Sequence, residues 1–311
     1  MSQTKLLTLN LFMRPPLVHN KNWDFKNQRL SYFISKIIKK YDIICLQETY
    51  AAYTSRQKKL LHEAANHNFL YHAISPLPKI FSTHIADCGL VILSKHKILE
   101  STFRPFNDSV YPDKLAYKGA LYAKILVNSK PLHLFNVHLQ SKHPTKSSKK
   151  YLMYRLTRRK QLIDLRNFVD EKIGLAEEPG FICGDLNVDG REELKPPVFK
   201  DIECLDDYEH LSKLLLRGKK VAMKDLLRWK YGFSPATFGR INEKGEALEK
   251  ILTMNHEICA DEALDYILLA NEDRTDLKIN VENTKVEPLS TEGEVFTQIS
   301  DHAGVETSFY Y

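Results

Sequence analysis

The stretch GFICGDLNVDG, residues 180–190, supports two different folds for this chain. Asp185, Asn187, Asp189 and Gly190 match the opening of an EF-hand calcium loop, D-x-[DN]-x-[DN]-G. The same letters also suit a short buried strand that ends in a polar site, because an apolar run comes directly before the first acid. The flanking residues must therefore distinguish a calcium loop from a strand-end site.

The residues around this stretch exclude the calcium loop. An EF-hand places a bidentate Glu at loop position 12, where this chain has Pro196. Helices should also flank the loop, whereas Pro179 and Gly180 introduce a short apolar run. We therefore expect a strand with Asp185 and Asn187 at its tip.

Composition points to a globular protein of ordinary character. The chain has 311 residues, of which 43% are hydrophobic and 27% charged, with a net charge of +6. This charge indicates mild attraction to phosphates or anionic lipid, but it is too small to identify a partner. One domain covering 1–311 can accommodate this length.

The cysteines and the apolar runs favour a cytoplasmic location, with peripheral membrane contact at most. The five cysteines are widely spaced and form no CxxC pair, which suits a reducing compartment better than a disulfide framework. The N-terminus lacks a small-residue cleavage site. No run of about 18 apolar residues occurs, so we expect no transmembrane segment.

Short apolar runs alternate with amphipathic stretches along the chain, which predicts α/β or α+β architecture. The predicted strands are 6–12, 42–48, 89–95, 119–127, 131–139, 180–186, 264–270 and 305–311. The predicted helices are 30–38, 55–67 and 148–173. Residues 200–260 show little periodicity beyond a helix in DYEHLSKLLLRG, and SPATFGRINEKGE reads as a loop.

Several predicted strands begin or end in residues that bind metals or move protons. They are Asn10, Glu48, Asn136, His138, Asp185, Asn187, Asp265, Asp301 and His302. Each has an ordinary explanation when taken alone, such as a turn cap, a solvated strand end or a hydrogen-bonded core histidine. Their occurrence at six strand ends instead predicts one pocket at an edge of the sheets.

The side-chain types indicate the chemistry of this pocket. Most of the donors are carboxylate and amide oxygens, and no Cys/His cluster has zinc spacing. Such donors favour Mg²⁺, with Mn²⁺ or Ca²⁺ as alternatives. A histidine with a carboxylate neighbour can accept a proton from water near neutral pH. Together these features predict phosphoryl transfer.

The order of the motifs resembles the endonuclease/exonuclease/phosphatase superfamily. LNLF, LQE, GLVILS, NVHL, GDLN, LDYILL and SDH follow one another from residue 9 to residue 302. The resemblance implies a DNase-I-like, four-layer α/β/β/α sandwich of two packed mixed sheets. It also implies one catalytic domain with its site at one edge of the sheets.

The resemblance implies a role for each residue of the site. Glu48 is the expected metal ligand, with Asn10 and Asp301 beside it. His302 is the expected base, oriented by Asp265. Asp185 and Asn187 are expected to position the nucleophile or the phosphate. His138 is expected to contact the phosphate or the leaving oxygen. The expected substrate-binding residues are Asn136, Asn187 and Lys118.

Residues 113–119, DKLAYKG, favour the neutral sphingomyelinase-like branch of the superfamily, which has a similar D-x-L-A-x-K-G element. Lys118 would then offer a charge to a phosphate; otherwise the segment is a turn with a surface lysine. The branch implies a Mg²⁺-dependent phosphodiesterase acting on a phospholipid such as sphingomyelin. A nuclease, an inositol-phosphate phosphatase and a catalytically silent binding protein remain as alternatives.

Residues 141–160 contain five Lys, three Arg and no acid. They could hold the protein on an anionic membrane surface. They could equally follow a nucleic-acid backbone, or form the solvated basic face of a helix.

Overall fold

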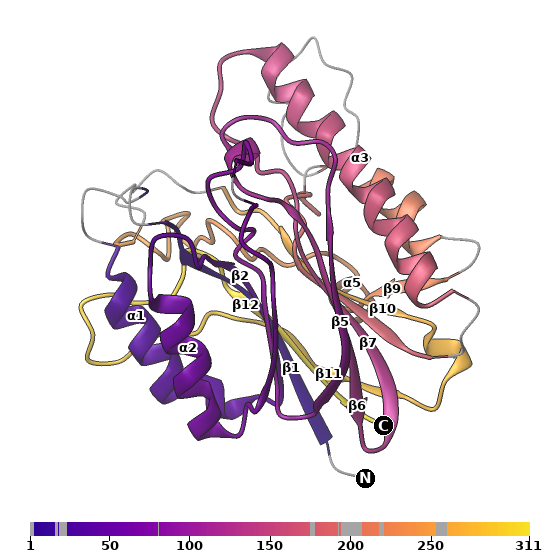
Figure 1. Ribbon diagram of the computed structural model, residues 1–311. Helices are drawn as coiled ribbons and strands as arrows, with labels where there is room; N and C mark the ends of the chain where they lie inside the picture. The colour runs from indigo at the N-terminus through magenta and orange to yellow at the C-terminus, as the bar shows by residue number, and fades with distance from the viewer. Residues whose placement is uncertain are drawn as a thin grey trace.

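The structure is a computed structural model, and two packed β-sheets with helices on both outer faces dominate it (Figure 1). It describes residues 3–15, 18, 24–79, 81–174, 178–191, 193, 207–217, 221–252 and 260–311. Cys204, Cys259, Pro196 and Gly218 lie outside the described residues.

The first sheet combines the two ends of the described chain. Its strands, in spatial order, are β11 (Lys278–Glu287), β12 (Gly304–Tyr310), β1 (Gln3–Met13), β2 (Ile43–Thr49), β4 (Val91–Ser94) and β3 (Tyr71–Ile74). β1 and β2 are parallel, and the other neighbours are antiparallel.

The second sheet is built from the middle of the chain. Its strands, in spatial order, are β5 (Lys97–Pro105), β6 (Gly119–Val127), β7 (Lys130–His138), β8 (Gly180–Asp185), β10 (Asp265–Ala270) and β9 (Met223–Asp225). β7 and β8 are parallel, and the other neighbours are antiparallel.

Helices cover the outer face of each sheet (Figure 1). The first sheet carries α1 (Lys26–Tyr32), η1 (Phe33–Ile37), η2 (Ile38–Lys40), α2 (Arg56–Ala64) and η3 (Ala65–His67). The second carries α3 (Ser148–Lys172), α4 (Asp207–Leu211) and η6 (Ser212–Leu216). The remaining helices are η4 (Asp113–Leu115), α5 (Leu226–Tyr231) and η7 (Glu272–Arg274).

The inner faces of the two sheets form the central hydrophobic core. Leu6, Ile43 and Ile92 from the first sheet pack in one cluster with residues from the second. Cys45 and Cys183 belong to this cluster as buried free thiols. These layers confirm the predicted α/β/β/α sandwich.

Four strands are absent from the predicted set, namely β3, β5, β9 and β11, and each lies at an edge of a sheet. An edge strand faces solvent along one side, so it needs no continuous apolar run. The sequence KILESTFRP of β5, for example, is mostly exposed or half-buried. The predicted strands are the central ones, where burial on both faces leaves a clear apolar pattern.

The stretch SPATFGRINEKGE agrees with the loop expected from the sequence. It contains no helix and only isolated β-bridges. Within the described ranges, no helix combines the length and apolar composition needed to cross a bilayer.

Candidate active site

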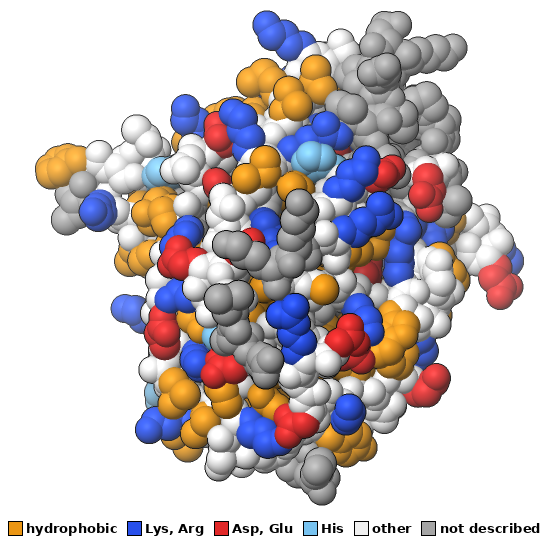
Figure 2. All heavy atoms as spheres, turned by 90° about the vertical axis from the view of Figure 1, so that its right-hand side faces the viewer, with side chains coloured by type: hydrophobic (Ala, Val, Ile, Leu, Met, Phe, Trp, Pro, Cys, Tyr) orange, Lys and Arg blue, Asp and Glu red, His pale blue; other side chains and the backbone are white. Residues whose placement is uncertain are grey.

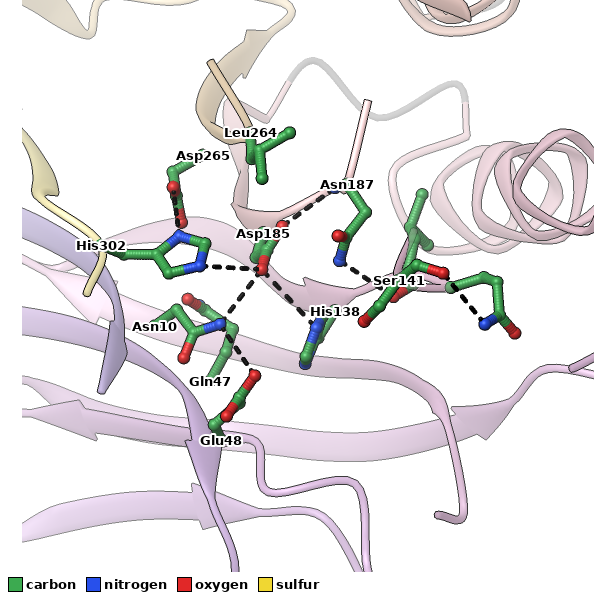
Figure 3. Close-up of polar contacts among 12 residues, drawn as sticks. Asn10, Gln47, Glu48, His138, Ser141, Asp185, Asn187, Leu264, Asp265 and His302 are labelled. Carbon is green, nitrogen blue, oxygen red and sulfur yellow. Dashed lines mark hydrogen bonds and ion pairs between the residues drawn. The ribbon is translucent and has the colours of Figure 1, made fainter. Parts of the chain in front are cut away.

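The polar strand ends meet at one edge of the sandwich, the end opposite the two chain termini (Figures 1 and 3). Parallel pairing brings the carboxyl ends of β1 and β2 together, and it does the same for β7 and β8. β10 runs antiparallel to β8, so Asp265 at its start pairs with Asp185. His302 precedes β12 by two residues and joins the same edge.

Asn10 links the two sheets at this edge. Its Nδ2 donates to Glu48 Oε1 at 3.2 Å and to Asp185 Oδ2 at 3.1 Å. Its Oδ1 accepts from the backbone N–H of Phe12 at 3.1 Å, which fixes the amide orientation. One short polar side chain therefore sets the spacing between a carboxylate of the first sheet and one of the second.

His302 and Asp265 form a buried pair. His302 Nδ1 lies 2.9 Å from Asp265 Oδ2, and its Nε2 lies 3.9 Å from Asp185 Oδ2 (Figure 3). Burial opposes a positive charge on His302, but Asp265, Asp185 and Asp301 outweigh it and raise the pKa well above its usual range. The pair is suited to take a proton and to stabilise the resulting imidazolium.

His138 lies on the other side of Asp185. Its Nε2 is 3.6 Å from Asp185 Oδ2. Burial, followed by the positive charge of Lys118, holds the pKa of His138 well below its usual range. Burial and the nearby Asp265 raise the pKa of Asp185. A neutral His138 suits hydrogen bonding to a substrate oxygen better than it suits storing a proton.

The backbone around the site adopts unusual conformations. Phe12, Glu48 and Asn187 have φ values of 53°, 54° and 51° although none is glycine. Such conformations cost of order 1–3 kcal/mol each and concentrate at functional sites. At Gly184 (φ 141°) a Cβ atom would lie 2.0 Å from the carbonyl oxygen of Val137, so only glycine allows β8 to approach β7 this closely.

The Glu48 carboxylate offers a free ligand atom. Its Oε2 is buried and has no hydrogen-bond partner among the described residues, which is costly for a charged group without a ligand. Burial, then repulsion from Glu48, raises the pKa of Asp301 to about 6. Two carboxylates that repel each other beside an unpartnered oxygen fit a divalent cation.

A second grouping of possible metal ligands overlaps with the first. Ligand atoms of Asp185, Asp265 and His302 all lie within 4.8 Å of one another and could hold a metal ion. Asp265 and His302 already form a 2.9 Å hydrogen bond with each other. Asp185 is therefore the one member of this group that has no such short contact with another member. Glu48 Oε2 and Asp265 Oδ1 are both buried without a hydrogen-bond partner among the described residues. We favour Glu48 as the principal ligand because Asp265 is already paired with His302, whereas in the described part of the chain the Glu48 carboxylate contacts only the neutral amide of Asn10.

Asn136 lies between the sheets, where its amide bonds to backbone and side-chain groups of the first sheet. Its Nδ2 donates to the carbonyl oxygens of Leu46 and Val91, both at 2.9 Å, and its Oδ1 accepts from Gln47 Nε2 at 2.7 Å. These three contacts occupy the amide and join the sheets. Among the described contacts none connects Asn136 with the site residues, so the geometry favours a supporting role over the expected substrate contact.

Lys118 lies behind the loop that follows β7. Its Nζ donates to the Leu139 carbonyl oxygen at 2.8 Å and lies 3.0 Å from Asp113 Oδ2. Asp113 also accepts from the backbone N–H of Ser141 and contacts His143 Nε2 at 2.6 Å. Burial would raise the pKa of Asp113, but Lys118 and His143 outweigh it and lower the pKa.

Asn187 and Lys118 share a partner. Asn187 Nδ2 donates to the Leu139 carbonyl oxygen at 3.3 Å, and its backbone N–H donates to Asp185 Oδ1 at 2.9 Å. Asn187 therefore reaches the site directly, whereas Lys118 acts on it through the Leu139 peptide and its electric field at His138.

Residues 234–239, within the predicted loop 234–246, also contribute to the site. The ring of Phe238 lies 4.7 Å from that of His302, centroid to centroid. Thr237 Oγ1 accepts from the backbone N–H of Asp265 at 3.2 Å, and its carbonyl oxygen accepts from Ala303 N–H at 2.7 Å. Neither residue is among the predicted site residues, because SPATFG has no strand or helix period and no adjacent acid or histidine.

The family comparison accounts for the order of these residues. A family model described as the Endonuclease/Exonuclease/phosphatase family matches residues 8–302. The chain belongs to the endonuclease/exonuclease/phosphatase family. It is thus a hydrolase of the family to which the sequence motifs pointed, and its six-stranded sheet pair is the scaffold that brings those motifs together.

Related members of the family are named as sphingomyelinases. A sphingomyelinase of Dictyostelium discoideum is 32% identical, with 93% of this chain and 75% of the relative covered. Sphingomyelinase C 2 of Leptospira interrogans is 30% identical over 60% of this chain and 31% of its own length. The comparison with the Leptospira protein thus concerns about a third of that relative.

A solved structure supports the fold. A crystal structure of Staphylococcus aureus beta toxin with bound magnesium ions has a TM-score of 0.69 at 20% identity, with 98% of this chain and 99% of that chain covered. The likeness extends over nearly the whole sandwich. This chain is therefore a sphingomyelinase-like member of the endonuclease/exonuclease/phosphatase family.

Proposed function

We propose that this chain is a single-domain, Mg²⁺-dependent phosphodiesterase that hydrolyses a phospholipid such as sphingomyelin. The observation that carries the proposal is the convergence of Glu48, Asp185 and the Asp265–His302 pair at one edge of the sandwich. The substrate class is supported by the sphingomyelinase named above, which aligns with 93% of this chain.

Glu48 and Asp301 would hold the cation, and Asn10 would orient Glu48, because Asn10 Oδ1 already accepts from the Phe12 N–H and its Nδ2 faces Glu48 as a donor. When bound, Mg²⁺ would neutralise charge that develops on the phosphate. Asn10 keeps Glu48 and Asp185 at a fixed spacing, which positions the ligand before any substrate arrives.

His302 would act as the base on water. Its Nδ1 is bonded to Asp265, so Nε2 is the nitrogen left to accept the proton. The water oxygen forms a bond to phosphorus, the bond between phosphorus and the lipid oxygen breaks, and the lipid alkoxide takes up a proton. The products are a phosphorylated headgroup and a lipid alcohol.

Asp185, His138 and Asn187 would position the reacting groups. Asp185 lies between both histidines and receives a hydrogen bond from Asn10. Neutral His138 would hydrogen-bond a phosphate oxygen. Lys118 would keep His138 neutral and support the peptide that Asn187 contacts.

A substrate panel tests this assignment. We expect Mg²⁺-dependent release of phosphorylated headgroup from sphingomyelin or a lysophospholipid, and no turnover with EDTA. Abasic DNA and phosphoinositides are assayed in parallel, together with Mn²⁺ and Ca²⁺ in place of Mg²⁺. Incision of DNA or dephosphorylation of inositol phosphates without lipid turnover would overturn the lipid assignment and favour those members of the superfamily.

Exposed apolar side chains on the loops at the site edge support action at a membrane. The β3–β4 and β5–β6 loops leave their sheets at the site edge, because Leu46 pairs with Val91 and Ala120 with Val137. Among the described residues, the exposed large apolar side chains on these loops and on the β2–α2 loop are Tyr53, Leu77, Phe81, Ile85 and Tyr111. Apolar and aromatic groups of this kind suit the interfacial zone of a bilayer.

The basic segment 141–160 is smaller as a surface than its sequence indicates. Figure 2 shows Lys and Arg side chains gathered on the side of the molecule where α3 lies. Ion pairs with described acids engage five of its basic residues: Lys142, Arg155, Arg158, Arg159 and Lys160. Lys146, Lys149 and Lys150 are the basic residues of this segment for which the described chain shows no acidic partner.

The double change Lys149→Ala/Lys150→Ala is expected to weaken binding to anionic vesicles by about 30-fold, because each basic residue near such a surface contributes ~1 kcal/mol. Sedimentation with phosphatidylserine vesicles at low and high salt measures this. Lys39→Ala/Lys40→Ala, on η2, is the matched control. If both double variants bind equally, or if binding does not depend on salt concentration, the segment does not contact the membrane surface.

A further inference from the structure

Three cationic side chains, Arg14, Lys26 and Arg56, lie beside the site, and we call them the basic corner. Arg14 follows the last residue of β1, and Lys26 and Arg56 are the first residues of α1 and α2. Figure 1 shows that both helices begin at the site end of the molecule. Arg56 Nη2 donates to the Arg14 carbonyl oxygen at 3.2 Å, which joins the corner.

The corner holds more positive charge than its described acid can balance. Asp24 lies 2.9 Å from Lys26 Nζ. Burial lowers the pKa of Lys26, and the positive charges of Arg56 and Arg14 lower it further. Asp24 opposes these effects without outweighing them. Met13 pairs with Thr49, the residue after Glu48, so Arg14 leaves β1 next to the Glu48 end of the site. The corner therefore adjoins the metal side of the site.

The two guanidinium groups have buried donors without acceptors. Nε and Nη2 of Arg14 and Nε of Arg56 are buried, and no described residue accepts a hydrogen bond from them. Neighbouring Arg29 shows the opposite arrangement, since it donates to four backbone carbonyl oxygens. Buried charged donors without acceptors are costly, and a bound phosphate or carboxylate would satisfy them with charge-assisted hydrogen bonds.

The orientation of Arg14 is already fixed. Its guanidinium carbon lies 4.1 Å from the centroid of the Phe12 ring, so the group stacks on an aromatic face. The first turn of α2 contains no acid, and its N-cap Ser55 makes no side-chain cap bond. The positive end of the α2 dipole thus adds to the field of the arginines.

We propose that Arg14 and Arg56 form a second anion site that binds a phosphate group, separate from the phosphate position beside His138. Two planar guanidinium groups with free donors match the oxygens of a phosphate. The ligand is a phosphate ester or inorganic phosphate, and a neighbouring lipid headgroup or a soluble anion can supply it. This site does not depend on which substrate the catalytic residues hydrolyse.

Titration of the full chain with inorganic phosphate in EDTA tests the site without catalysis. Calorimetry and melting temperature are the readouts, because a ligand that binds the folded state raises the melting temperature. Arg14→Gln is expected to weaken phosphate binding about tenfold, the usual effect of losing a charge-assisted hydrogen bond, and Arg14→Lys less. Without phosphate, Arg14→Gln should melt no lower than the original chain.

Two controls locate the bound anion. Arg104→Gln removes a cation that pairs with Glu171 and should leave phosphate binding unchanged. Glu48→Gln, which changes the metal side of the site, should also retain it. Phosphate that binds the original chain and Arg14→Gln equally, or does not bind at all, counts against a soluble ligand.

A second arm distinguishes the lipid source. Vesicles of phosphatidylcholine with and without phosphatidic acid are sedimented with the original chain, Arg14→Gln and Arg56→Gln. Loss of the preference for phosphatidic acid in these variants identifies a lipid phosphate as the ligand. If the variants keep both this preference and phosphate binding, or the original chain shows neither, the proposal is overturned.

Discussion

His302→Ala is expected to lower kcat by about 10²–10⁴-fold, the usual contribution of a general base. The residue lies at the end of the Asp265–His302 pair, where Nε2 is left to receive the proton from water. KM should change far less, because the imidazole acts on the water. Steady-state hydrolysis of the best substrate from the panel measures both constants.

The pH profile gives an independent check on His302. Asp265, Asp185 and Asp301 raise the pKa of His302 above its usual range, against the effect of burial. The protonated form cannot accept a proton, so activity should fall as the pH drops through this pKa and rise above it. His302→Ala should lose this acid limb. His72→Ala, an exposed histidine on the edge strand β3, should keep both rate and profile. An unchanged rate in His302→Ala would refute its role.

Glu48→Gln is expected to abolish turnover at ordinary Mg²⁺ concentrations. The change keeps the size of the side chain but replaces the charged carboxylate, which includes the unpartnered Oε2 atom, by a neutral amide. Loss of a residue that only hydrogen-bonds a metal ligand already costs roughly 10–100-fold in metal affinity, and loss of the principal ligand should cost at least as much. High Mg²⁺ should restore part of the activity.

Metal binding can be followed without catalysis. Mg²⁺ should raise the melting temperature of the original chain, and the concentration required should be at least tenfold higher for Glu48→Gln, about the lower bound for a weakened metal site. Glu294→Gln, at an exposed position, is the matched control. If Glu48→Gln and Glu294→Gln respond alike to Mg²⁺, the ligand is elsewhere, and Asp185 becomes the next candidate.

The sequence predicted those site residues whose position follows from the end of a buried strand. Glu48, Asp185 and Asp265 follow or begin apolar runs, and strand pairing brings such ends to one edge. The same rule failed to anticipate the setting of Asn136. Alternation places Asn136 and His138 on the same face of β7. It does not show where along that face the first sheet packs, and the first sheet covers Asn136 but leaves His138 in the site.

Phe238 and the basic corner illustrate a second limit of sequence reasoning. Phe238 reaches His302 from a loop, and Arg14, Lys26 and Arg56 meet at the starts of different elements. No periodic pattern links such residues, because their proximity depends on how loops fold over the sheet edge. Apolar periodicity predicts the scaffold, whereas contacts of this kind require tertiary structure.

The chain order of the sheets has a consequence for protein synthesis. All strands of the second sheet, residues 97–270, lie between the two parts of the first, and β12 pairs with β1 across almost the full sequence. During translation β1 is therefore made long before β12, and until β12 is made one edge of β1 is open to pairing with other chains. His302 emerges just ahead of β12. The proposed base, His302, is thus synthesised after every other residue of the site, and an unfinished chain lacks the group that activates water.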